Sequence, residues 1–387
     1  MKIVLLVIDA LGLKNEQSFG TLNRILKYSS ANNFFSTFNI CNKELKKQEI
    51  NNINVNSTYI TPSTRIPDSY LGHSEMIDAR IEVQEVFITE SLCEKLSFLS
   101  KYGEVRLDNG IILVGDKFVI GNNGECQPGL NLNILWLTKP NIGEKEMDKL
   151  AQNLLNVSNC TRVIQMWGNE VTLEEVYNKA IKERNYLGKT YEFLCIPPLN
   201  IYNEKYQVKH FGKEATNRNL LETLAESGIN IQLIGKVGKM FTLNWNNVKI
   251  NYSGADTQKT LNELIEHISN QDNNCFIFCN IQEIDLAGHE QNIEKSVKVL
   301  RIISDNLMKI VNEVEEDDII IITADHGNDP MDGSTFHSYE DVPLIILSKK
   351  NMCFNRDFGI SLREIAYSIE RLFGLKSTGK ELFYSEN

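Results

Sequence analysis

The chain has 387 residues and a formal net charge of −11, with 42% hydrophobic and 24% charged residues. This balance is typical of a soluble globular protein, and the length exceeds what one hydrophobic core usually supports, so two domains are expected. An acidic chain without a basic block disfavours nucleic acid as a partner, and no apolar run reaches the roughly 20 residues of a membrane helix. A phosphorylated small molecule is compatible with this charge if bound cations and local Lys or Arg residues offset it.

The N-terminal segment and the cysteines favour a cytoplasmic location. Met1–Asp9 holds one Lys and then an apolar run closed by an acid, which predicts a first core strand rather than a signal peptide. The eight Cys residues are scattered without CxxC spacing, so reduced thiols are expected rather than disulfides. Cys275 and Cys279 share one face of a predicted strand, where core packing explains them.

The first 80 residues predict a strand, a helix and two polar segments. Lys2–Ile8 is a buried strand that ends at Asp9, and Phe19–Tyr28 is a short helix. The Asn-rich stretch Glu49–Ser57 is expected to be a loop. Thr58–Arg80 is polar and predicts a loop that leads into a helix.

From about residue 82 the pattern changes. Glu104–Ile120 alternates like a hairpin, with Asp108-Asn109-Gly110 as its turn signal. Leu173–Arg184 has a polar helical pattern, and Pro197-Pro198 breaks the chain near the end of the segment. We therefore expect residues 85–208 to form an inserted α+β cap or substrate domain, and residues 1–84 and 209–387 to form a discontinuous catalytic core.

After Phe211-Gly212, strand and helix patterns alternate again. Strands alternating with helices predict an α/β core whose mostly parallel sheet is flanked by helices. The expected strands are Ile229–Ile234, Cys275–Ile281, Ile319–Thr323 and Pro343–Leu347; the expected helices are Thr216–Ser227 with Gly228 as C-cap, Thr257–Ser269, Glu290–Val314 and about Ser361–Phe373.

A predicted strand, Ile319–Thr323, leads directly to Asp325 and His326, and His337 follows in the same loop. Functional residues of open α/β sheets lie where strands end at their carboxyl edge. One carboxylate oxygen and one imidazole nitrogen suit Zn²⁺ or Mn²⁺, and Gly327 allows a sharp turn after them. A structural Asp-His hydrogen bond is the alternative for this pair taken alone.

Further acids and imidazoles follow apolar runs elsewhere in the chain. Asp9 and Asp285 both come after strand-like segments, and His289 lies four residues after Asp285, with a Gly between them at an expected bend. Three acids and three imidazoles exceed the needs of one ion and suit two ions roughly 3.5–4 Å apart, as in phosphoryl transfer. Taken singly, Asp9 could cap a helix and His289 could be a core histidine.

Ser69 is the candidate nucleophile. It stands just before a predicted helix, in Asp68-Ser69-Tyr70-Leu71-Gly72-His73, where backbone N–H groups favour a phosphate. Metal coordination would activate its hydroxyl. The alternative is that Ser69 is simply the N-cap of the helix.

These motifs together resemble the alkaline phosphatase superfamily of metalloenzymes and, within it, the phosphopentomutase family. The resemblance runs through residues 1–80 and 209–387 and is faint in the cap. The matching stretches are Val7–Gly12, Asp68-Ser69 with Gly72–Met76, Lys209 with Phe211-Gly212, Ile234–Lys236, Asp285–His289, and Thr323–Pro330 with His337.

The resemblance implies two metal sites and a phosphoserine. One ion would be held by Asp285, His289 and His337, and the other by Asp9, Asp325, His326 and the Ser69 oxygen. This branch typically uses Mn²⁺, and Lys209 and Lys236 become candidate phosphate contacts. The chain departs from phosphopentomutases in two ways. It carries Ser69 where they usually carry Thr, and phosphoglycerate mutases carry Ser at this position. Its segment Ile201–Val208 contains Lys205 as its one basic residue, whereas phosphopentomutases are rich in Arg there.

The function that the resemblance implies is a two-metal phosphosugar mutase with a phosphoserine intermediate, interconverting sugar 1-phosphate and 5-phosphate. The inserted domain would exclude water, which separates a mutase from a phosphatase. Three alternatives keep some of the same features: a phosphatase or phosphodiesterase, a phosphoglycerate-mutase-like enzyme, and a metal-binding module without turnover. Oligomeric state is not predicted.

Overall fold

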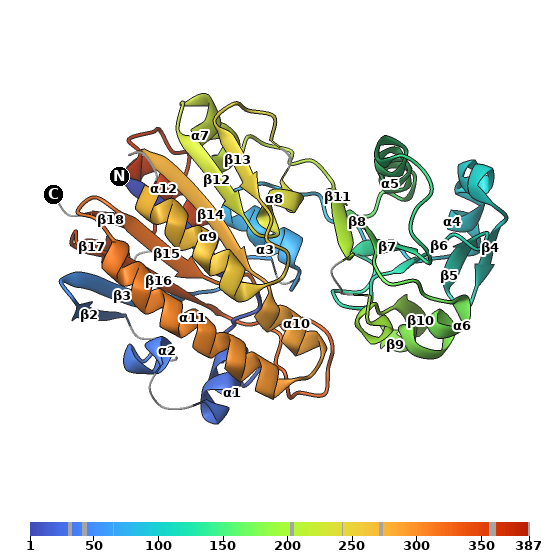
Figure 1. The fold of residues 1–387 in the computed structure, drawn as a ribbon, viewed down its shortest axis with the longest axis horizontal. Coiled ribbons are helices and arrows are strands. Elements are labelled where there is room, and N and C mark those ends of the chain that lie inside the picture. Colours follow the sequence, from blue (N-terminus) through green and yellow to red (C-terminus); the bar gives the residue numbers. More distant parts are fainter. Residues whose placement is uncertain are drawn as a thin grey trace. The chain divides into compact units, whose positions relative to one another are not determined.

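The computed structural model describes residues 1–29, 33–40, 45–64, 66–201, 205–241, 243–270, 274–355 and 361–385. The chain divides into two compact units (Figure 1). Unit 1 is Met1–Arg80 with Thr216–Asn387, and unit 2 is Ile81–Ala215. The boundaries expected from the sequence, at residues 84/85 and 208/209, therefore both fall inside unit 2.

Unit 1 is built on an eight-stranded sheet. Its neighbours are parallel from the first strand to the fifth, and the last three strands join antiparallel to their neighbours. The strand order is β13 (Val248–Asn251), β12 (Asn230–Ile234), β14 (Cys275–Ile281), β1 (Lys2–Ile8), β15 (Ile319–Thr323), β16 (Val342–Ser348), β3 (Ile53–Ile60) and β2 (Lys46–Ile50).

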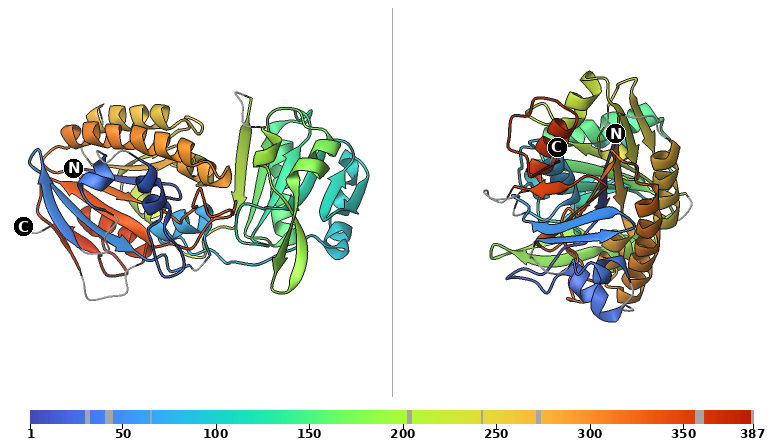
Figure 2. Two further views of the ribbon diagram at one scale, coloured as in Figure 1. Left: turned by 90° about the horizontal axis from the view of Figure 1, so that it is seen from below. Right: turned by 90° about the vertical axis from the view of Figure 1, so that its left-hand side faces the viewer.

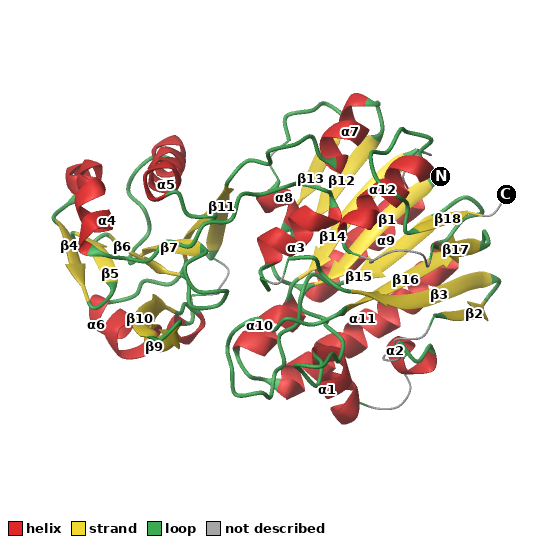
Figure 3. Cartoon of the chain, turned by 180° about the vertical axis from the view of Figure 1, so that it is seen from behind, coloured by secondary structure: helices red, strands yellow, loops and turns green. Residues whose placement is uncertain are grey.

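Helices cover both faces of this sheet. The long helices α9 (Thr257–Asn270) and α11 (Ile293–Glu313), gold and orange in Figure 2, lie along one face. Helices α3 (Ser69–Met76), α7 (Leu220–Glu226) and α12 (Arg363–Leu372) lie on the other (Figure 3). Because strands covered on both faces need apolar residues throughout, every residue of β1, β14 and β15 is buried. The predicted α/β class is confirmed.

The remaining elements of unit 1 are short. They are α1 (Thr21–Tyr28), α2 (Phe34–Thr37), α8 (Val237–Met240), α10 (Glu283–His289) and the strands β17 (Met352–Phe354) and β18 (Phe383–Ser385). The predicted bend at Asp285–His289 is wrong, because these residues lie in α10. A helix brings residues four apart to one face, so the spacing of this pair has a helical reason.

The prediction that Glu49–Ser57 is a loop is also wrong. These residues belong to β2 and β3, which pair as a hairpin with Ile50 opposite Ile53. Asn51 and Asn52 form the two-residue turn, with φ of 50° and 63°. Asn tolerates this left-handed conformation better than most residues, so the Asn content reflects the turn.

Unit 2 contains a six-stranded sheet and a separate two-stranded hairpin. The sheet order is β11 (Gln207–Gly212), β8 (Arg162–Trp167), β7 (Asn131–Trp136), β6 (Phe118–Asn122), β5 (Ile111–Val114) and β4 (Val105–Asp108); the hairpin is β9 (Ile181–Tyr186) and β10 (Lys189–Leu194). The helical segments are α4 (Glu90–Lys95), Ser97–Tyr102, α5 (Glu144–Ser158), α6 (Leu173–Glu175), Val176–Ala180 and Pro197–Leu199.

Two predictions for this unit have opposite outcomes. The hairpin around Asp108-Asn109-Gly110 is confirmed as β4 and β5, and Asn109 and Gly110 have the positive φ values of its turn. The helix predicted over Leu173–Arg184 is wrong beyond residue 180, where β9 begins. Pairing with β10 stabilises an extended conformation that the polar local pattern does not reveal.

The turn between β9 and β10 supports a stability prediction. Leu187 and Gly188 form its two central residues, and Leu187 has φ of 50° and is 84% exposed. A branched side chain is disfavoured in this conformation, whereas Asn-Gly is preferred there. We expect Leu187→Asn to raise the free energy of unfolding of unit 2 by about 1 kcal/mol in urea titrations. Leu187→Ala is the control for side-chain removal, and equal stability of the Asn and Ala variants would contradict the explanation.

Candidate metal centre

Three parallel neighbours of the unit 1 sheet, β14, β1 and β15, lead to the predicted ligands. Asp9 follows β1, Asp325 and His326 follow β15, and Asp285 and His289 lie on α10, which follows β14. The carboxyl ends of parallel neighbours share one edge of a sheet, so residues distant in sequence meet there.

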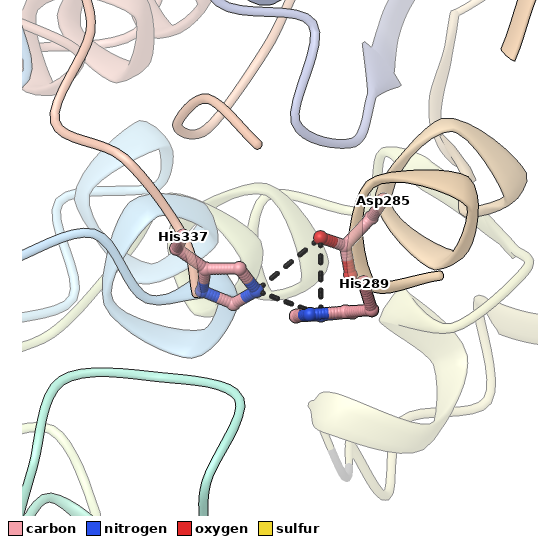
Figure 4. Close-up of side chains that lie close together, drawn as sticks. All are labelled: Asp285, His289 and His337. Atoms are coloured by element: carbon pink, nitrogen blue, oxygen red, sulfur yellow. Dashed lines mark hydrogen bonds and ion pairs between the residues drawn. The ribbon is translucent and has the colours of Figure 1, made fainter. Parts of the chain in front are cut away.

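Asp285, His289 and His337 form the first group, called here the two-histidine group (Figure 4). The Oδ1 atom of Asp285 lies 3.4 Å from Nε2 of His289 and 3.2 Å from Nε2 of His337. The two Nε2 atoms are 3.2 Å apart. One carboxylate oxygen and two imidazole nitrogens thus converge on one point.

The other ring nitrogens show how the two imidazoles are oriented. Nδ1 of His289 lies 2.6 Å from the carbonyl oxygen of Thr335, and Nδ1 of His337 lies 3.1 Å from that of Pro67. A carbonyl can only accept, so each Nδ1 is the nitrogen that donates, and each ring turns its Nε2 toward the other ring and toward Oδ1 of Asp285. Nε2 is thereby the atom that each ring offers to a metal ion. The donor set therefore fits a divalent metal ion.

A hydrogen bond from Asn328 orients the carboxylate of Asp285. The Nδ2 atom of Asn328 donates to Oδ1 of Asp285 at 3.0 Å. The helix and this loop approach so closely that a Cβ on Gly288 would lie 2.4 Å from the Asn328 side chain. Burial opposes ionisation of Asp285, but His289 and His337 hold the pKa of its carboxyl well below the usual value. Asp285 therefore keeps its negative charge.

Asp9, Asp325 and His326 form the second group, called here the serine-side group. Nε2 of His326 lies 3.3 Å from Oδ2 of Asp325 and 3.6 Å from Oδ1 of Asp9. Asp325 Oδ1 accepts from the backbone N–H groups of Ala10 and His326. Its Oδ2 is buried and accepts no aligned hydrogen bond from the described residues. A buried carboxylate oxygen that accepts no aligned hydrogen bond is suited to binding a cation, so this group also fits a metal ion.

Burial and neighbouring charges shift the pKa values of these three residues in different directions. Burial, reinforced by the charge of Asp325, raises the pKa of Asp9 well above its usual value. Burial also opposes ionisation of Asp325, but His326 and His73 lower its pKa. Burial lowers the pKa of His326 to about 4, so the ring is neutral at physiological pH and can act as a ligand.

Ser69 lies beside the serine-side group. Its Oγ is 3.0 Å from Nε2 of His326 and 3.4 Å from Oδ1 of Asp9. The residue begins α3, and the N-cap is Asp68, whose side chain accepts from the backbone N–H of Leu71. The alternative that Ser69 serves as the N-cap is therefore wrong.

Lys236 completes the surroundings of Ser69. Its Nζ donates to Ser69 Oγ at 3.0 Å and forms an ion pair with Asp9. Burial opposes its charge, but Asp9, Asp285 and Asp325 raise its pKa above the usual value, so the ammonium stays protonated. The turn that carries it depends on Gly235, where φ is +80° and a Cβ would lie 2.4 Å from the carbonyl oxygen of Asn280.

The two groups adjoin. The rings of His326 and His337 stack with centroids 3.9 Å apart and an interplanar angle of 24°. All predicted site residues except Lys209 therefore come together in unit 1.

Lys209 lies instead on β11 in unit 2. Its Nζ contacts Glu144 at 2.6 Å and Asp148 at 2.8 Å, both on α5. Burial opposes its charge, but these hydrogen bonds raise its pKa above the usual value. The ammonium is already neutralised by two carboxylates of its own unit.

Buried polar residues that the sequence motifs do not mark lie around these ligands. Asn280 is the one polar residue besides Cys in the apolar strand β14, a signal that could have marked it. Glu340 and Thr21 had no such signal. The Glu340 carboxylate accepts from Thr21 N at 2.8 Å and from Ser338 Oγ at 2.6 Å, next to His337.

Glu340 supports a prediction on pH dependence. It is fully buried, and burial raises its pKa from 4.5 to about 7. Because the folded protein binds this proton more tightly than the unfolded chain, the stabilisation is complete below pH 4.5 and is lost as pH rises to about 7. At 1.36 kcal/mol per unit the loss is about 3 kcal/mol.

We expect Glu340→Gln to remove this dependence. In urea titrations of the metal-free protein at pH 4 and pH 8, the unaltered protein should lose about 3 kcal/mol more stability than the variant between the two values. The comparison of slopes cancels the other titrating groups. Parallel slopes would show that Glu340 does not titrate in this range.

No helix within the described residues is long and apolar enough to cross a membrane.

Comparison with known proteins relates the whole chain to one family. A model of the Metalloenzyme superfamily matches residues 1–377. Phosphopentomutase from Carboxydothermus hydrogenoformans is 32% identical over 185 residues, which cover 46% of this chain and 45% of that protein. Phosphopentomutase from Thermotoga maritima is 31% identical over 172 residues, or 43% of each chain. The matched region thus covers less than half the length of each of these curated relatives.

A solved structure shows the same fold. Phosphoglycerate mutase from Leishmania mexicana superposes with a TM-score of 0.53 at 12% sequence identity, covering 99% of this chain and 98% of that one. At this identity the match concerns the fold alone.

Proposed function

The chain belongs to the Metalloenzyme superfamily, and we propose that within it the protein is a two-metal phosphotransferase acting through phosphorylated Ser69. Its most specific form is a phosphosugar mutase of phosphopentomutase type, interconverting a sugar 1-phosphate and a 5-phosphate. One observation carries the proposal: Ser69 Oγ lies 3.0 Å from both Lys236 Nζ and His326 Nε2, beside two groups of converging ligands.

The two groups would hold two divalent ions, with Mn²⁺ the proposed metal and Zn²⁺ compatible with the same donors. Asp285, His289 and His337 would bind one ion, and Asp9, Asp325 and His326 with the Ser69 oxygen the other. When bound, the metals would supply positive charge that offsets the phosphoryl oxygens and lower the pKa of the Ser69 hydroxyl.

The protein's own groups would position the reaction. Ser69 Oγ attacks the phosphorus of the sugar phosphate, the bond from phosphorus to the sugar oxygen breaks, and that oxygen takes the proton that the Ser69 hydroxyl gives up. The other sugar hydroxyl then attacks phospho-Ser69 and gives up its proton, the bond from phosphorus to Ser69 Oγ breaks, and Oγ takes up a proton as the isomer is released. The charged Lys236, in contact with Ser69 Oγ, would stay beside the phosphoryl group through both transfers.

Burial of the nucleophile favours a mutase over a phosphatase. Ser69 is 5% exposed and Asp9 is fully buried. A phosphoserine in such surroundings is poorly accessible to water, which would otherwise hydrolyse it. In this proposal unit 2 is a cap or substrate domain, and Lys209 is a candidate contact for a substrate phosphate. Since Glu144 and Asp148 already bind Lys209, a phosphate would have to compete with them.

A phosphoglycerate-mutase-like activity is the second candidate. Ser69 stands where phosphopentomutases carry Thr, and the Asp285–His289 spacing also resembles phosphoglycerate mutases. The two candidates differ in substrate and not in the metal centre.

A substrate screen tests the proposal. The metal-loaded protein is incubated with ribose 1-phosphate, ribose 5-phosphate or 3-phosphoglycerate and followed by ³¹P NMR. Interconversion of the ribose phosphates without inorganic phosphate supports the first candidate, and turnover of 3-phosphoglycerate alone supports the second. Release of inorganic phosphate from each compound would show a phosphatase, and no reaction with any would contradict the proposal.

A further inference from the structure

We propose that His73 is a positioning residue that fixes Asp325 relative to the helix carrying Ser69, with Asn280 selecting the tautomer that does so. This inference rests on the proposed function in one respect: Asp9 and Asp325 are taken to bind a metal ion. Neither His73 nor Asn280 is itself placed as a ligand.

His73 connects two parts of the serine-side group. The ring is fully buried on α3, one turn after Ser69. Its Nδ1 lies 2.7 Å from the carbonyl oxygen of Ser69 and 3.1 Å from Oδ2 of Asp325. Both are acceptors, so Nδ1 must carry the proton, and its N–H dipole stabilises the carboxylate.

Asn280 enforces this choice from the opposite side of the ring. Its Nδ2 lies 2.9 Å from Nε2 of His73, and an amide NH₂ can only donate, so Nε2 must be the acceptor. The same Nδ2 lies 3.4 Å from Oδ2 of Asp9. Turning the amide over would place its oxygen against that carboxylate, so Asp9 fixes the orientation of Asn280.

The contacts form one continuous path through the serine-side group. It runs from Asp9 through Asn280 and His73 to Asp325, with a branch to the backbone of Ser69. The helix and the ligand loop also touch directly, since a Cβ on Gly72 would lie 2.7 Å from Cβ of Asp325. The backbone N–H groups of Ala10 and His326 hold Oδ1 of Asp325, so His73 acts on the other oxygen, Oδ2.

Within the part of the chain that the structure describes, the hydrogen bonds given for this path end at the serine-side group. Asp285, His289 and His337 are oriented by Asn328, Thr335 and Pro67 instead. Loss of a group that orients a ligand typically weakens metal binding about 10–100-fold. We therefore expect selective weakening of one of two ions, which a general loss of structure does not produce.

The test compares variants of full-length, metal-free protein titrated with Mn²⁺ by calorimetry. His73→Leu should weaken one of the two Mn²⁺ sites about 10-fold or more and leave the other within about 2-fold. His73→Asn, which keeps an N–H near the position of Nδ1, should recover most of that affinity. Ser74→Ala is the matched control: this neighbouring serine is 1% exposed and its hydroxyl has no hydrogen-bond partner among the described residues, so both sites should be unchanged.

A second variant guards against misfolding of His73→Leu. Asn280→Leu removes the donor to Nε2 of His73 and the contact with Oδ2 of Asp9, and it should weaken the same site. The loss in the double variant should be smaller than the sum of the two single losses. Additive losses, equal weakening of both sites, or unchanged binding in His73→Leu would each overturn the inference. If the unaltered protein binds no second Mn²⁺, the proposed two-metal function fails, whereas intact binding insensitive to His73 defeats only the positioning role.

Discussion

Ser69→Ala is expected to lower kcat for the sugar phosphate by about 10⁴-fold or more, because removal of a covalent nucleophile leaves only binding and electrostatic effects. The alanine variant should also fail to gain the mass of one phosphoryl group after incubation with substrate, a gain that intact-protein mass spectrometry should detect in the unaltered protein. The Ser69 hydroxyl contacts Lys236, Asp9 and His326, and the alanine variant loses these contacts.

Two further variants make this result specific. Ser69→Thr keeps the hydroxyl and adds one methyl group, so part of the activity and the phosphorylated form should remain. Ser74→Ala removes another buried hydroxyl from the same helix and should have near-normal kcat. A Ser69→Ala protein with normal turnover would exclude the covalent mechanism.

The second large effect concerns the metal ions. A strong chelator should abolish activity, and added Mn²⁺ should restore it. Asp285→Asn and Asp325→Asn should each lower kcat/KM by about 10³-fold or more, because phosphoryl transfer depends on charge neutralisation by both ions. The effect should be similar for the two variants, since each belongs to a different group of ligands.

Asp317→Asn is the matched control for charge removal. Asp317 is an exposed acid that pairs with Lys350 at 2.8 Å and belongs to neither group. Its replacement should leave kcat/KM within about 2-fold, as for most surface substitutions. Full activity in excess chelator, or normal activity of the Asp285 variant, would contradict a two-metal centre.

The sequence predicted the central strands because their position in the sheet dictates their composition. Strands β1, β14 and β15 are covered on both faces and therefore consist of apolar runs. The outer strand β2 alternates between partly buried and exposed residues, and its Asn-rich turn resembles a loop. The polar pattern of β9 predicts a helix, because the extended form of this strand depends on pairing with β10, which no local pattern reveals.

Residues directly after those strands could be proposed as ligands for the same reason. Asp9 and Asp325 follow β1 and β15, so their proximity is a consequence of parallel topology. The contacts of Asn280, His73 and Glu340 depend on how α3 and the loops pack, and side-chain types alone do not specify that. Lys209 illustrates the opposite case, since its partners Glu144 and Asp148 lie on α5 and were not foreseen.

The central claim is that phosphorus passes between two sugar oxygens through Ser69 without water. The most direct test is turnover of ribose 1-phosphate with Mn²⁺ in oxygen-18-labelled water, followed by ³¹P NMR, in which the heavy isotope shifts the phosphorus signal. We predict that ribose 5-phosphate accumulates without labelled oxygen on phosphorus and that no inorganic phosphate forms. Labelled inorganic phosphate without the isomer would contradict the account and identify a hydrolase.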